Sequence, residues 1–426
     1  MFIKNIKLSI FTTSFFLTIF FLSENSYSYT VNDIFKLTEE NNEIIIAEKG
    51  YLDKFSNDIY LAEISNDPSI TLSGSVGAKF QDNSNGSNDF NPRSLSLTVS
   101  QNLYDGNRNE YTILQAKDLL TQSQHNFENL KQGIFLQSIH AYLDLIRLRQ
   151  TLEISIDNVT LSENYLNFTI NDFELGNATK NELDQASVTY EKNKFNLSRI
   201  EDQINNQERV LFKYIKTIPQ DINMLDFNYF NLNMSSDYYH NLAMDNNPNL
   251  LANKLLLDIL NYGLVIEGAA NKPRVDIEAG ITRSWDFTAS SGQADELSIM
   301  GRVSVPLNES EQVQMKQRNI NLEINRHKRV LDDLEYNLKR EIDNIINNIK
   351  LNELELDIEN KQKEVLLNEV TIEKESYKLG VSSSLDVYES EINLNNQSLK
   401  LIELNNNIYK SYFSLLNQLG DLKVNQ

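Results

Sequence analysis

Apolar residues recur at steps of three and four along much of the chain, and the clearest series is Leu331, Leu334, Leu338, Ile342, Ile345 and Ile349. This spacing gathers the side chains on one side of an α-helix that packs lengthwise against neighbours. Proline costs a helix interior about 3 kcal/mol, and none occurs between Pro92 and Pro219 or after Pro306. The pattern therefore predicts long helices over 107–175 and 308–379, and shorter helices over 31–65, 178–216, 236–270 and 382–417.

The lengths of these tracts indicate how the helices are arranged. At 1.5 Å per residue, the tract 107–175 would span about 100 Å. The helices over 31–65 and 178–216, placed end to end, would cover roughly 110 Å. One long helix beside two stacked short ones therefore gives a pillar about 100 Å tall, and the second half of the chain repeats the arrangement.

Four other segments alternate apolar and polar residues with a period of two. In one of them Leu95, Leu97 and Val99 alternate with serine and threonine. This period is typical of β-strands with one apolar and one polar face, and lengths of about 9–12 residues fit tilted strands that cross a membrane. We predict strands over 69–80, 93–103, 274–287 and 296–305.

The segments between the paired strands are polar. Residues 81–92 and 288–296 are rich in Asn, Ser, Gly and Asp, which predicts loops that join each pair into a hairpin. Aromatic residues stand near the loop ends, where a membrane barrel carries an aromatic girdle. We expect membrane-interface anchors at Trp285, Phe287, Phe80 and Phe90.

Four strands cannot close a barrel by themselves. A soluble antiparallel sheet with one wet face would show the same alternation, so that alternative stays open on the strands alone. In lipid, an open sheet edge would leave backbone groups unpaired at a cost of several kcal/mol each, by the general rule for membrane strands. Other copies of the chain must then complete the sheet, with eight strands from two copies or twelve from three.

The order of elements occurs twice. Asn41-Asn42 recurs as Asn246-Asn247 and Pro68 recurs as Pro273, at an offset of 205 residues. Leu103 recurs as Leu307, and Leu175-Gly176 recurs as Leu379-Gly380, at an offset of 204 residues. This offset is much longer than the period of a solenoid repeat, so each half is a whole assembly unit.

The N-terminus has the features of a secretory signal peptide. Lys4 and Lys7 precede an apolar stretch from Leu8 to Leu22, and Ser26-Tyr27-Ser28 resembles a cleavage site. We predict a signal peptide over 1–28; an uncleaved anchor helix is the alternative. No later stretch has the run of about 18 apolar residues that a membrane helix needs, so we expect the exported chain to have no helical route through a bilayer.

Composition excludes several functions. The 426 residues include no cysteine, so disulfides, zinc–thiolate sites and a thiol nucleophile are ruled out. A formal charge of −21 argues against a nucleic-acid partner. The four histidines lack metal-ligand spacing, and neither a nucleotide-binding glycine motif nor a general acid–base pair stands out. We expect no metal, no cofactor and no enzymatic activity.

Several motifs then resemble the TolC family of outer-membrane efflux channels, and they occur in order in both halves. Residues 242–250 read LAMDNNPNL and residues 100–106 read SQNLYDG. A turn motif begins YKLG at Tyr377 and continues with Ser383, Asp386 and Val387. Its first copy begins FELG at Phe173 and continues with Thr179 and Glu182.

The resemblance implies a mainly α protein with a membrane β-barrel contribution. Three copies would form a twelve-stranded β-barrel, four strands per protomer, continuous with a long antiparallel helical barrel. The implied segments are a signal peptide (1–28), a first repeat (29–216), an equatorial linker (217–235), a second repeat (236–420) and a C-terminal tail (421–426). The homotrimer would sit in the outer membrane of a Gram-negative cell, with its helical part in the periplasm.

Family members act as passive exit ducts in efflux pumps or type I secretion systems. The resemblance therefore implies two partners, a periplasmic adaptor protein and an inner-membrane transporter of the RND or ABC class, besides outer-membrane lipid. The cargo is not identified by the sequence. The alternatives are a periplasmic adaptor with a long helical hairpin, and a coiled-coil stalk that conducts nothing.

The predicted functional site is the pair of helix-to-helix turns. Gly176 and Gly380 suit sharp reversals, because glycine tolerates a positive φ. Asp386 and Glu389 are three residues apart on one helical face, and in a trimer they would form acidic rings that favour cations. The resemblance implies a periplasmic gate and selectivity ring of Asp386, Glu389, Tyr377 and Glu182. Alternatively, the acids only favour a helix N-terminus. In the family, the tyrosine that matches Tyr377 helps to latch the helices shut. The family has a basic residue in this turn where this chain has Ser382, so the strength of the latch stays open.

Overall fold

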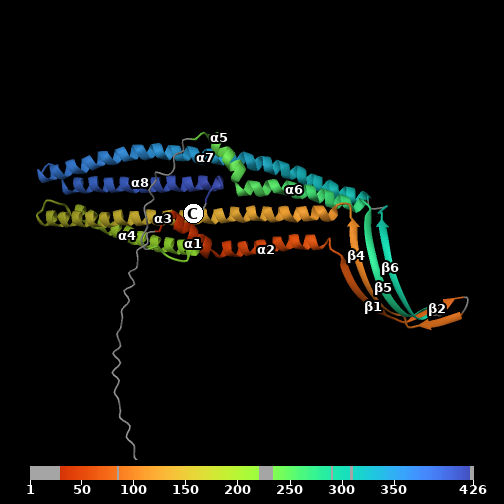
Figure 1. Cartoon of the computed structure of the whole chain (residues 1–426). Helices are drawn as coiled ribbons and strands as arrows, with labels where there is room; N and C mark the ends of the chain where they lie inside the picture. The colour runs from red at the N-terminus through yellow and green to blue at the C-terminus, as the bar shows by residue number, and fades with distance from the viewer. Residues whose placement is uncertain (1–28, 84–85, 220–233, 289–290, 308–309, 423–426) are drawn as a thin grey trace, which may run out of the picture.

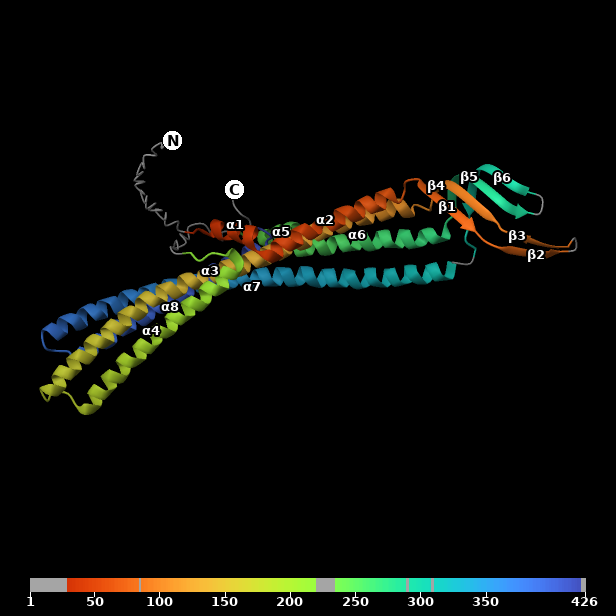
Figure 2. The ribbon, with the colours of Figure 1, turned by 90° about the horizontal axis from the view of Figure 1, so that it is seen from below.

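The computed structural model describes residues 29–83, 86–219, 234–288, 291–307 and 310–422. The predicted signal peptide, most of the predicted linker and residues 423–426 lie outside these ranges. The molecule is long and thin, with its main β-sheet at one end and two helix-to-helix turns at the other (Figures 1 and 2).

The helices follow the same order in both halves of the chain. The first half contains α1 (Val31–Asn41), α2 (Glu43–Ile64), α3 (Arg108–Glu174) and α4 (Lys180–Ile215). The second half contains α5 (Ser236–Asn246), α6 (Pro248–Gly268), the short 3₁₀ helix η1 (Ala269–Asn271), α7 (Ser310–Lys378) and α8 (Ser384–Gln418).

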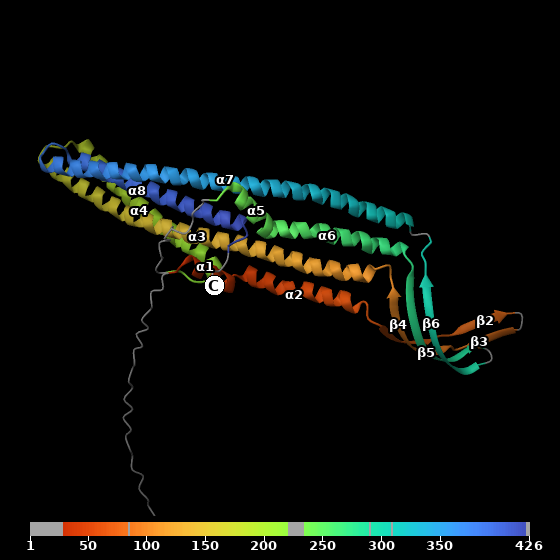
Figure 3. The same ribbon diagram turned by 45° about the horizontal axis from the view of Figure 1, so that its top comes forward.

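The long helices lie side by side in a row. In the half near the sheet, α2 packs on α3, α3 on α6, and α6 on α7; in the other half, α4 packs on α3, α3 on α8, and α8 on α7. Each long helix thus runs beside two shorter ones, as the tract lengths predicted. In the half near the sheet the row has α7 at one edge and α2 at the other (Figure 3). In the other half its edges are α7 and α4.

The predicted single helices over 31–65 and 236–270 are each broken in two, so that part of the prediction is wrong. Asn42 and Asn247 adopt extended backbone at the breaks, and both are nearly buried. The Asn42 side chain accepts hydrogen bonds from the N–H groups of Ile44 and Ile45, and Asn247 accepts one from Leu250. An asparagine that caps the next helix stabilises the break. Pro248 adds to the second break, because a residue before proline disfavours helical backbone.

The strands form one four-stranded antiparallel sheet and one two-stranded ribbon. The sheet has the order β1-β4-β5-β6, with β1 (Ser69–Val76), β4 (Arg93–Tyr104), β5 (Arg274–Thr288) and β6 (Ser291–Ser304). The ribbon pairs β2 (Lys79–Asn83) with β3 (Gly86–Phe90) and extends beyond the sheet (Figure 1).

The predicted loops were too long. Most of 81–92 belongs to the β2–β3 ribbon. Residues 288 and 291–296 belong to β5 and β6, and residues 289–290 lie outside the described ranges. The predicted strand over 69–80 ends at Val76, and Lys79 starts the ribbon. Backbone pairing in a hairpin does not require apolar side chains, so the polar composition of these segments concealed their strands.

The sheet has two chemically different faces. Its exposed face carries apolar side chains that lie opposite one another across the strands, such as Leu72, Leu97, Ile281 and Leu297. The other face carries short hydroxyl side chains, and three cross-strand pairs are hydrogen bonded at 2.7–2.8 Å: Ser69–Ser100, Ser75–Ser94 and Ser96–Thr282. The period-two alternation therefore predicted the faces correctly.

The buried core lies at mid-length, in two clusters that correspond to the two halves. One cluster surrounds α1 and α3, with Ile34, Phe135 and Tyr142 nearly inaccessible to solvent. The other joins α5, α6, α7 and α8 around Ile342 and Ile349. The helices outside this region are far less buried, which leaves much apolar surface on the single protomer.

One helix contradicts the expectation that no later stretch is apolar enough to cross a membrane. Pro248–Asn271, which comprises α6 and η1, is 24 residues long; an 18-residue window within it has a mean hydropathy of 1.2, and 17% of that window is buried in the protomer. The segment is long and apolar enough to cross a membrane, judged by its length and composition alone. Its place in the row between α3 and α7 gives its apolar residues two helices to pack against.

Gly420 follows the C-terminal end of α8, next to the second core cluster, and has a left-handed backbone conformation (φ +71°). A Cβ at this position would meet the carbonyl of Asn246, with Cδ of Pro248 3.2 Å away. We expect Gly420→Ala to destabilise the fold by about 1–2 kcal/mol from the backbone conformation alone, with a further steric cost. Thermal unfolding of the purified protein in detergent measures this loss.

Gly133 provides a matched control, because it lies inside α3 and a Cβ added there would meet no atom within 4 Å. Gly133→Ala should leave the unfolding temperature unchanged or raise it, since alanine favours a helix by about 0.5–1 kcal/mol over glycine. Equal unfolding temperatures for Gly420→Ala and the native protein would contradict the prediction.

Candidate functional site

The two helix-to-helix turns at the far end of the molecule have the same backbone design. Gly176 (φ +79°) ends the α3 side and Gly380 (φ +72°) ends the α7 side. The N–H of Gly380 donates to the carbonyl of Tyr377 at 3.0 Å, and the N–H of Val381 donates to that of Ser376 at 2.9 Å. These bonds satisfy the last carbonyls of the helix, and only glycine adopts the required backbone without strain.

Both turns expose large apolar side chains. Leu175 in the first turn is 74% exposed, and Leu379 and Val381 in the second are each 79% exposed. Apolar side chains that extend into solvent at the two equivalent tips contribute nothing to the packing of this chain. They are suited to contact with another molecule.

The acidic residues Asp386 and Glu182 cap the helices that follow the turns. The backbone N–H and the hydroxyl of Ser383 both donate to Oδ2 of Asp386 at 2.7 Å, and Thr179 donates in the same way to Glu182 at 2.6 and 2.9 Å. These hydrogen bonds, led by the backbone N–H, lower the pKa of both carboxyl groups. Each carboxylate therefore has a local structural role at a helix start, and each stays ionised at neutral pH.

Glu389 differs from Asp386. It lies one turn further along α8 and is exposed, and within the described ranges it forms neither a hydrogen bond nor an ion pair. Its charge is thus free to act on ions or on a neighbouring molecule. The spacing of three residues predicted that the two acids share a helical face.

Two aromatic contacts join the second hairpin to the first just above the turns. Tyr388 of α8 stacks on Tyr165 of α3, with ring centroids 4.9 Å apart and planes 12° apart. Tyr377 of α7 meets Phe168 of α3 edge-on at 6.2 Å. Nδ2 of Asn193 on α4 donates to the hydroxyl of Tyr388 at 3.4 Å. We refer to Tyr165, Phe168, Asn193, Tyr377 and Tyr388 as the tip latch.

Sequence reasoning found only Tyr377 of the tip latch. The other four residues carry no motif, and their sequence separations reveal no contact. One signal was present: Tyr388 lies two residues after Asp386, close to the turn that the sequence singled out. Ser382, which replaces the family's basic residue, donates its hydroxyl to the carbonyl of Glu373 at 3.1 Å and so stays within its own turn.

A second attachment between the hairpins lies higher up. Nζ of Lys410 on α8 approaches both carboxylate oxygens of Asp144 on α3, at 2.7 and 2.8 Å. The ring of His140 lies beside this pair, 3.3 Å from the carbonyl of Lys410, and burial lowers its pKa. At neutral pH the imidazole is therefore uncharged and does not compete with Lys410 for Asp144.

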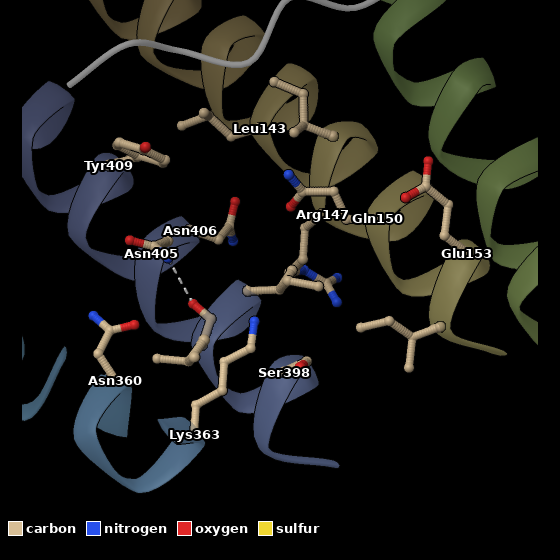
Figure 4. A pocket seen from close by; sticks show the side chains of 14 residues that line it. Leu143, Arg147, Gln150, Glu153, Asn360, Lys363, Ser398, Asn405, Asn406 and Tyr409 are labelled. Atoms are coloured by element: carbon tan, nitrogen blue, oxygen red, sulfur yellow. Dashed lines mark hydrogen bonds between the residues drawn. The ribbon is translucent and has the colours of Figure 1, made fainter. Parts of the chain in front are cut away.

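A cavity of about 520 Å³ lies between α3 and α8 (Figure 4). Residues of α3 and α8 form most of its wall, and Asn360 and Lys363 of α7 close one side. Between the cavity and the tip latch the two helices meet again, where Nδ2 of Asn395 on α8 donates to Oδ1 of Asn158 on α3 at 2.8 Å.

The protomer has open edges on both sides. One edge of the sheet is β1 and the other is β6, while the helix row ends with α2 and α4 on the first side and α7 on the second. Along α7, an exposed apolar stripe repeats about every seven residues on the side away from α8. Its members are 49–67% exposed: Met315, Leu322, Tyr336, Leu351, Ile358, Val365 and Ile372. A stripe with this period is the seam of a helix that packs on another helix.

The aromatic anchors predicted for the membrane interface all belong to the outer part of the β-structure. Trp285 pairs with Arg93 and Gln293 near the end of the sheet that is far from the helices. Phe80 and Phe90 lie at the start of the β2–β3 ribbon, and Phe80 is 68% exposed. Phe287 follows Trp285 in β5.

No group of three His, Asp or Glu side chains within the described ranges could hold a metal ion. His125, His140, His240 and His327 lie at separate places in the helical part. His327 lies in the row, where its Nε2 is 2.8 Å from the carbonyl of Asn253. The site therefore offers carboxylates, aromatic contacts and apolar tips, with no such cluster of ligands.

An amphipathic sheet with two open edges, continued by a row of long helices, is the architecture of a membrane channel protein. The chain belongs to the outer membrane efflux protein family, whose model matches residues 35–215 and 240–421. The two matches fall on the two halves that the sequence offset separated. The protein is an efflux channel of the outer membrane, and its helical part lies in the periplasm.

Known relatives agree with this assignment. The chain is 17% identical over 335 residues to the outer membrane efflux protein BepC of Brucella suis biovar 1 (strain 1330), covering 78% of this chain and 73% of BepC. Its fold matches the CmeC outer membrane channel of Campylobacter jejuni with a TM-score of 0.78, at 14% identity, covering 99% of this chain and 95% of that one. It matches the outer membrane protein VceC of Vibrio cholerae with a TM-score of 0.76, at 15% identity, covering 92% and 96%.

These findings decide between the alternatives left open by the sequence. The periplasmic adaptor is wrong, because the matched family is that of the outer-membrane component. A coiled-coil stalk is not supported either, since the sheet and its apolar face belong to the same channel fold. The family and the fold are those of transport proteins, not of enzymes.

Proposed function

We propose that three copies of the chain close into one passive duct that crosses the outer membrane and extends into the periplasm. One observation carries this proposal: the sheet and the helix row have their unpaired edges on the same two sides of the protomer. On one side these edges are β1 with α2 and α4, and on the other they are β6 with α7. Joining β6 to β1 of the next copy also brings α7 against α2 and α4 of that copy. A single rotation would thus cover both edges, as expected for a closed ring.

The lining of the sheet favours three copies over two. An eight-stranded barrel is just wide enough for side chains to fill, whereas a duct needs more strands. The inner face carries polar side chains, many of them short serines and threonines, and twelve strands would leave an open lumen within it. This arrangement also gives every strand edge in the membrane a partner.

The tip is the proposed gate. Tyr377 belongs to the tip latch, and Glu389 with Asp386 would place two levels of carboxylates around the axis of the trimer. Glu182 would add a charge on the neighbouring hairpin. Carboxylate rings attract cations and repel anions. Separation of the tip latch would let the α7–α8 hairpin move away from α3 and widen the entrance.

The proposed partners are a periplasmic adaptor and an inner-membrane transporter of the RND or ABC class. The exposed Leu175, Leu379 and Val381 support adaptor contact at the tips, because they are apolar and unpacked in the protomer. Transport energy would come from the transporter, in efflux or in type I secretion. We further propose that Trp285, Phe287, Phe80 and Phe90 anchor the barrel at the membrane interface.

We expect Glu389→Gln together with Asp386→Asn to reduce the cation preference of the channel severalfold, because both charges leave the entrance. Asparagine can still accept the hydrogen bond of the Ser383 N–H, so this substitution separates charge from capping. Reversal potentials in planar bilayers measure the preference. Glu48→Gln, at an exposed acid of α2 far from the turns, should change little. Unaltered selectivity in the double variant would refute the gate.

The pH dependence should reveal Asp386 in a variant that carries both Glu389→Gln and Glu182→Gln, because hydrogen bonds from Thr179 lower the pKa of Glu182 in the same way. Hydrogen bonds from Ser383 lower the pKa of Asp386, so its carboxylate stays ionised while pH falls through the usual range for an aspartate. The remaining cation preference should therefore persist in that range and disappear only at lower pH. A loss at the usual aspartate pKa would show that Asp386 does not supply the charge.

A further inference from the structure

Within the described strands, the membrane-facing side of the sheet carries charged residues near its outer end only, in two neighbouring rows. Arg93 and Trp285 lie opposite each other in the outermost row that crosses all four strands. Arg283 and Asp295 lie opposite each other in the next row. All residues of the two rows below them are apolar. One row is Leu72, Leu97, Ile281 and Leu297, and the other is Ile70, Val99, Ala279 and Ile299.

This level coincides with the outer limit of the membrane. From Val275 to Trp285 the strand β5 advances ten residues, or about 33 Å at 3.3 Å per residue. A tilt of about 40° reduces the height to roughly 25 Å, the usual height of the apolar band of a membrane barrel. Since the helical part is periplasmic, the Trp285 row lies at the outer leaflet, where tryptophan favours the level of the lipid headgroups.

The ion pair holds Arg283 in place. Its Nε lies 2.6 Å from Oδ1 of Asp295 and its Nη2 lies 2.8 Å from Oδ2, so the guanidinium is bound through two parallel contacts. Arg93 has no such partner within the described ranges, and it is exposed. Together the two arginines and one aspartate leave one positive charge at the rim of each protomer.

The register places the two guanidinium groups within reach of one ligand. Arg93 faces Trp285 across the strands, and Arg283 is two residues before Trp285 on the same face. Residues in this diagonal relation have Cβ atoms about 7–8 Å apart, which long side chains can bridge. The fork of arginine matches the oxygens of a phosphate group.

We propose that Arg93 and Arg283 bind the phosphate of an outer-leaflet lipid, with Trp285 packed beside its headgroup. Asp295 orients Arg283 and limits the net charge, so that the rim is stable next to hydrocarbon before a lipid arrives. The site lies at the opposite end of the molecule from the gate and is independent of it. It would fix the height of the barrel in the bilayer.

Binding of lipid A to the purified full-length assembly in detergent tests the proposal, with native mass spectrometry to measure the lipid retained. Wild-type protein should bind lipid A about tenfold more tightly than the dephosphorylated lipid, as expected for charge-assisted hydrogen bonds to phosphate. Inorganic phosphate at the same concentration should not displace the lipid. Equal binding of the two lipids would overturn the proposal, and displacement by inorganic phosphate would show a free-anion site instead.

Two variants locate the site. Arg93→Gln, which leaves the ion pair intact, should weaken lipid A binding about tenfold, and Arg283→Gln with Asp295→Asn should do the same by replacing the charged pair with two amides. Arg302→Gln is the matched control, because Arg302 lies on β6 but on the opposite face of the sheet, beside Glu278. Native affinity in both rim variants, or an equal loss in Arg302→Gln, would overturn the assignment.

Discussion

Replacement of Ile358 and Val365 by aspartate should abolish the proposed trimer. Both side chains belong to the exposed stripe of α7, where they are 62% and 58% exposed in the protomer. Burial of such a side chain against a neighbouring copy contributes about 1.5–3 kcal/mol, and the substitution places a carboxylate in the seam instead. In the proposed ring the effect would occur at three interfaces. We expect monomer in place of the heat-modifiable trimer on electrophoresis of unheated membrane samples.

Leu367→Asp is the matched control for this experiment. Leu367 is also a large apolar residue of α7 and is 54% exposed, but it lies on the opposite side of the helix from the stripe. Its trimer should persist. A stable trimer from the Ile358→Asp, Val365→Asp protein would mean that the stripe is not the seam between subunits.

Removal of the stacked pair Tyr165 and Tyr388 by alanine should open the tip. An aromatic pair contributes about 0.5–1.5 kcal/mol beyond the burial of its area. Three copies would then shift the balance between closed and open states by roughly 1.5–4.5 kcal/mol, a factor of more than ten. We expect a large increase in single-channel conductance or open probability in planar bilayers.

The chain offers a control with the same chemistry at its other end. Tyr111 of α3 and Tyr262 of α6 also form an aromatic pair between the two halves, with ring centroids 5.9 Å apart, but near the sheet. Loss of that pair should leave conductance unchanged. Tyr388→Phe, which keeps the stack and loses only the hydroxyl contact with Asn193, should retain most of the closed state. If the Tyr165→Ala, Tyr388→Ala channel conducts like the native one, the aromatic stack is not a latch.

The periodic patterns allowed the fold class to be predicted because they follow from how each element is packed. The series from Leu331 to Ile349 identified α7, of which Leu338, Ile342 and Ile349 are buried. The alternation around Leu97 identified the two faces of the sheet. The breaks at Asn42 and Asn247 were missed, because an asparagine inside an apolar helical pattern is a cap only when the backbone turns there.

The site was less accessible to sequence reasoning. Glycine before a capping motif identified both turns, since backbone conformation and capping are local properties. The contact between Tyr165 and Tyr388 joins residues that are far apart in sequence, and depends on how two hairpins lie against each other. The polar ribbon of β2 and β3 escaped for a related reason, because its hydrogen bonds are made by the backbone and its side chains show no apolar face.

The hydroxyl groups on the inner face of the sheet have a consequence for what travels through the pore. Ser69 and Ser100, and likewise Ser75 and Ser94, already satisfy each other's hydrogen bonding across neighbouring strands. On the same face Glu278 and Arg302 also engage each other, as an ion pair at 3.4 Å. In the proposed duct these polar groups already have partners in the wall, so they would bind a passing molecule weakly, as suits an exit shared by unrelated compounds.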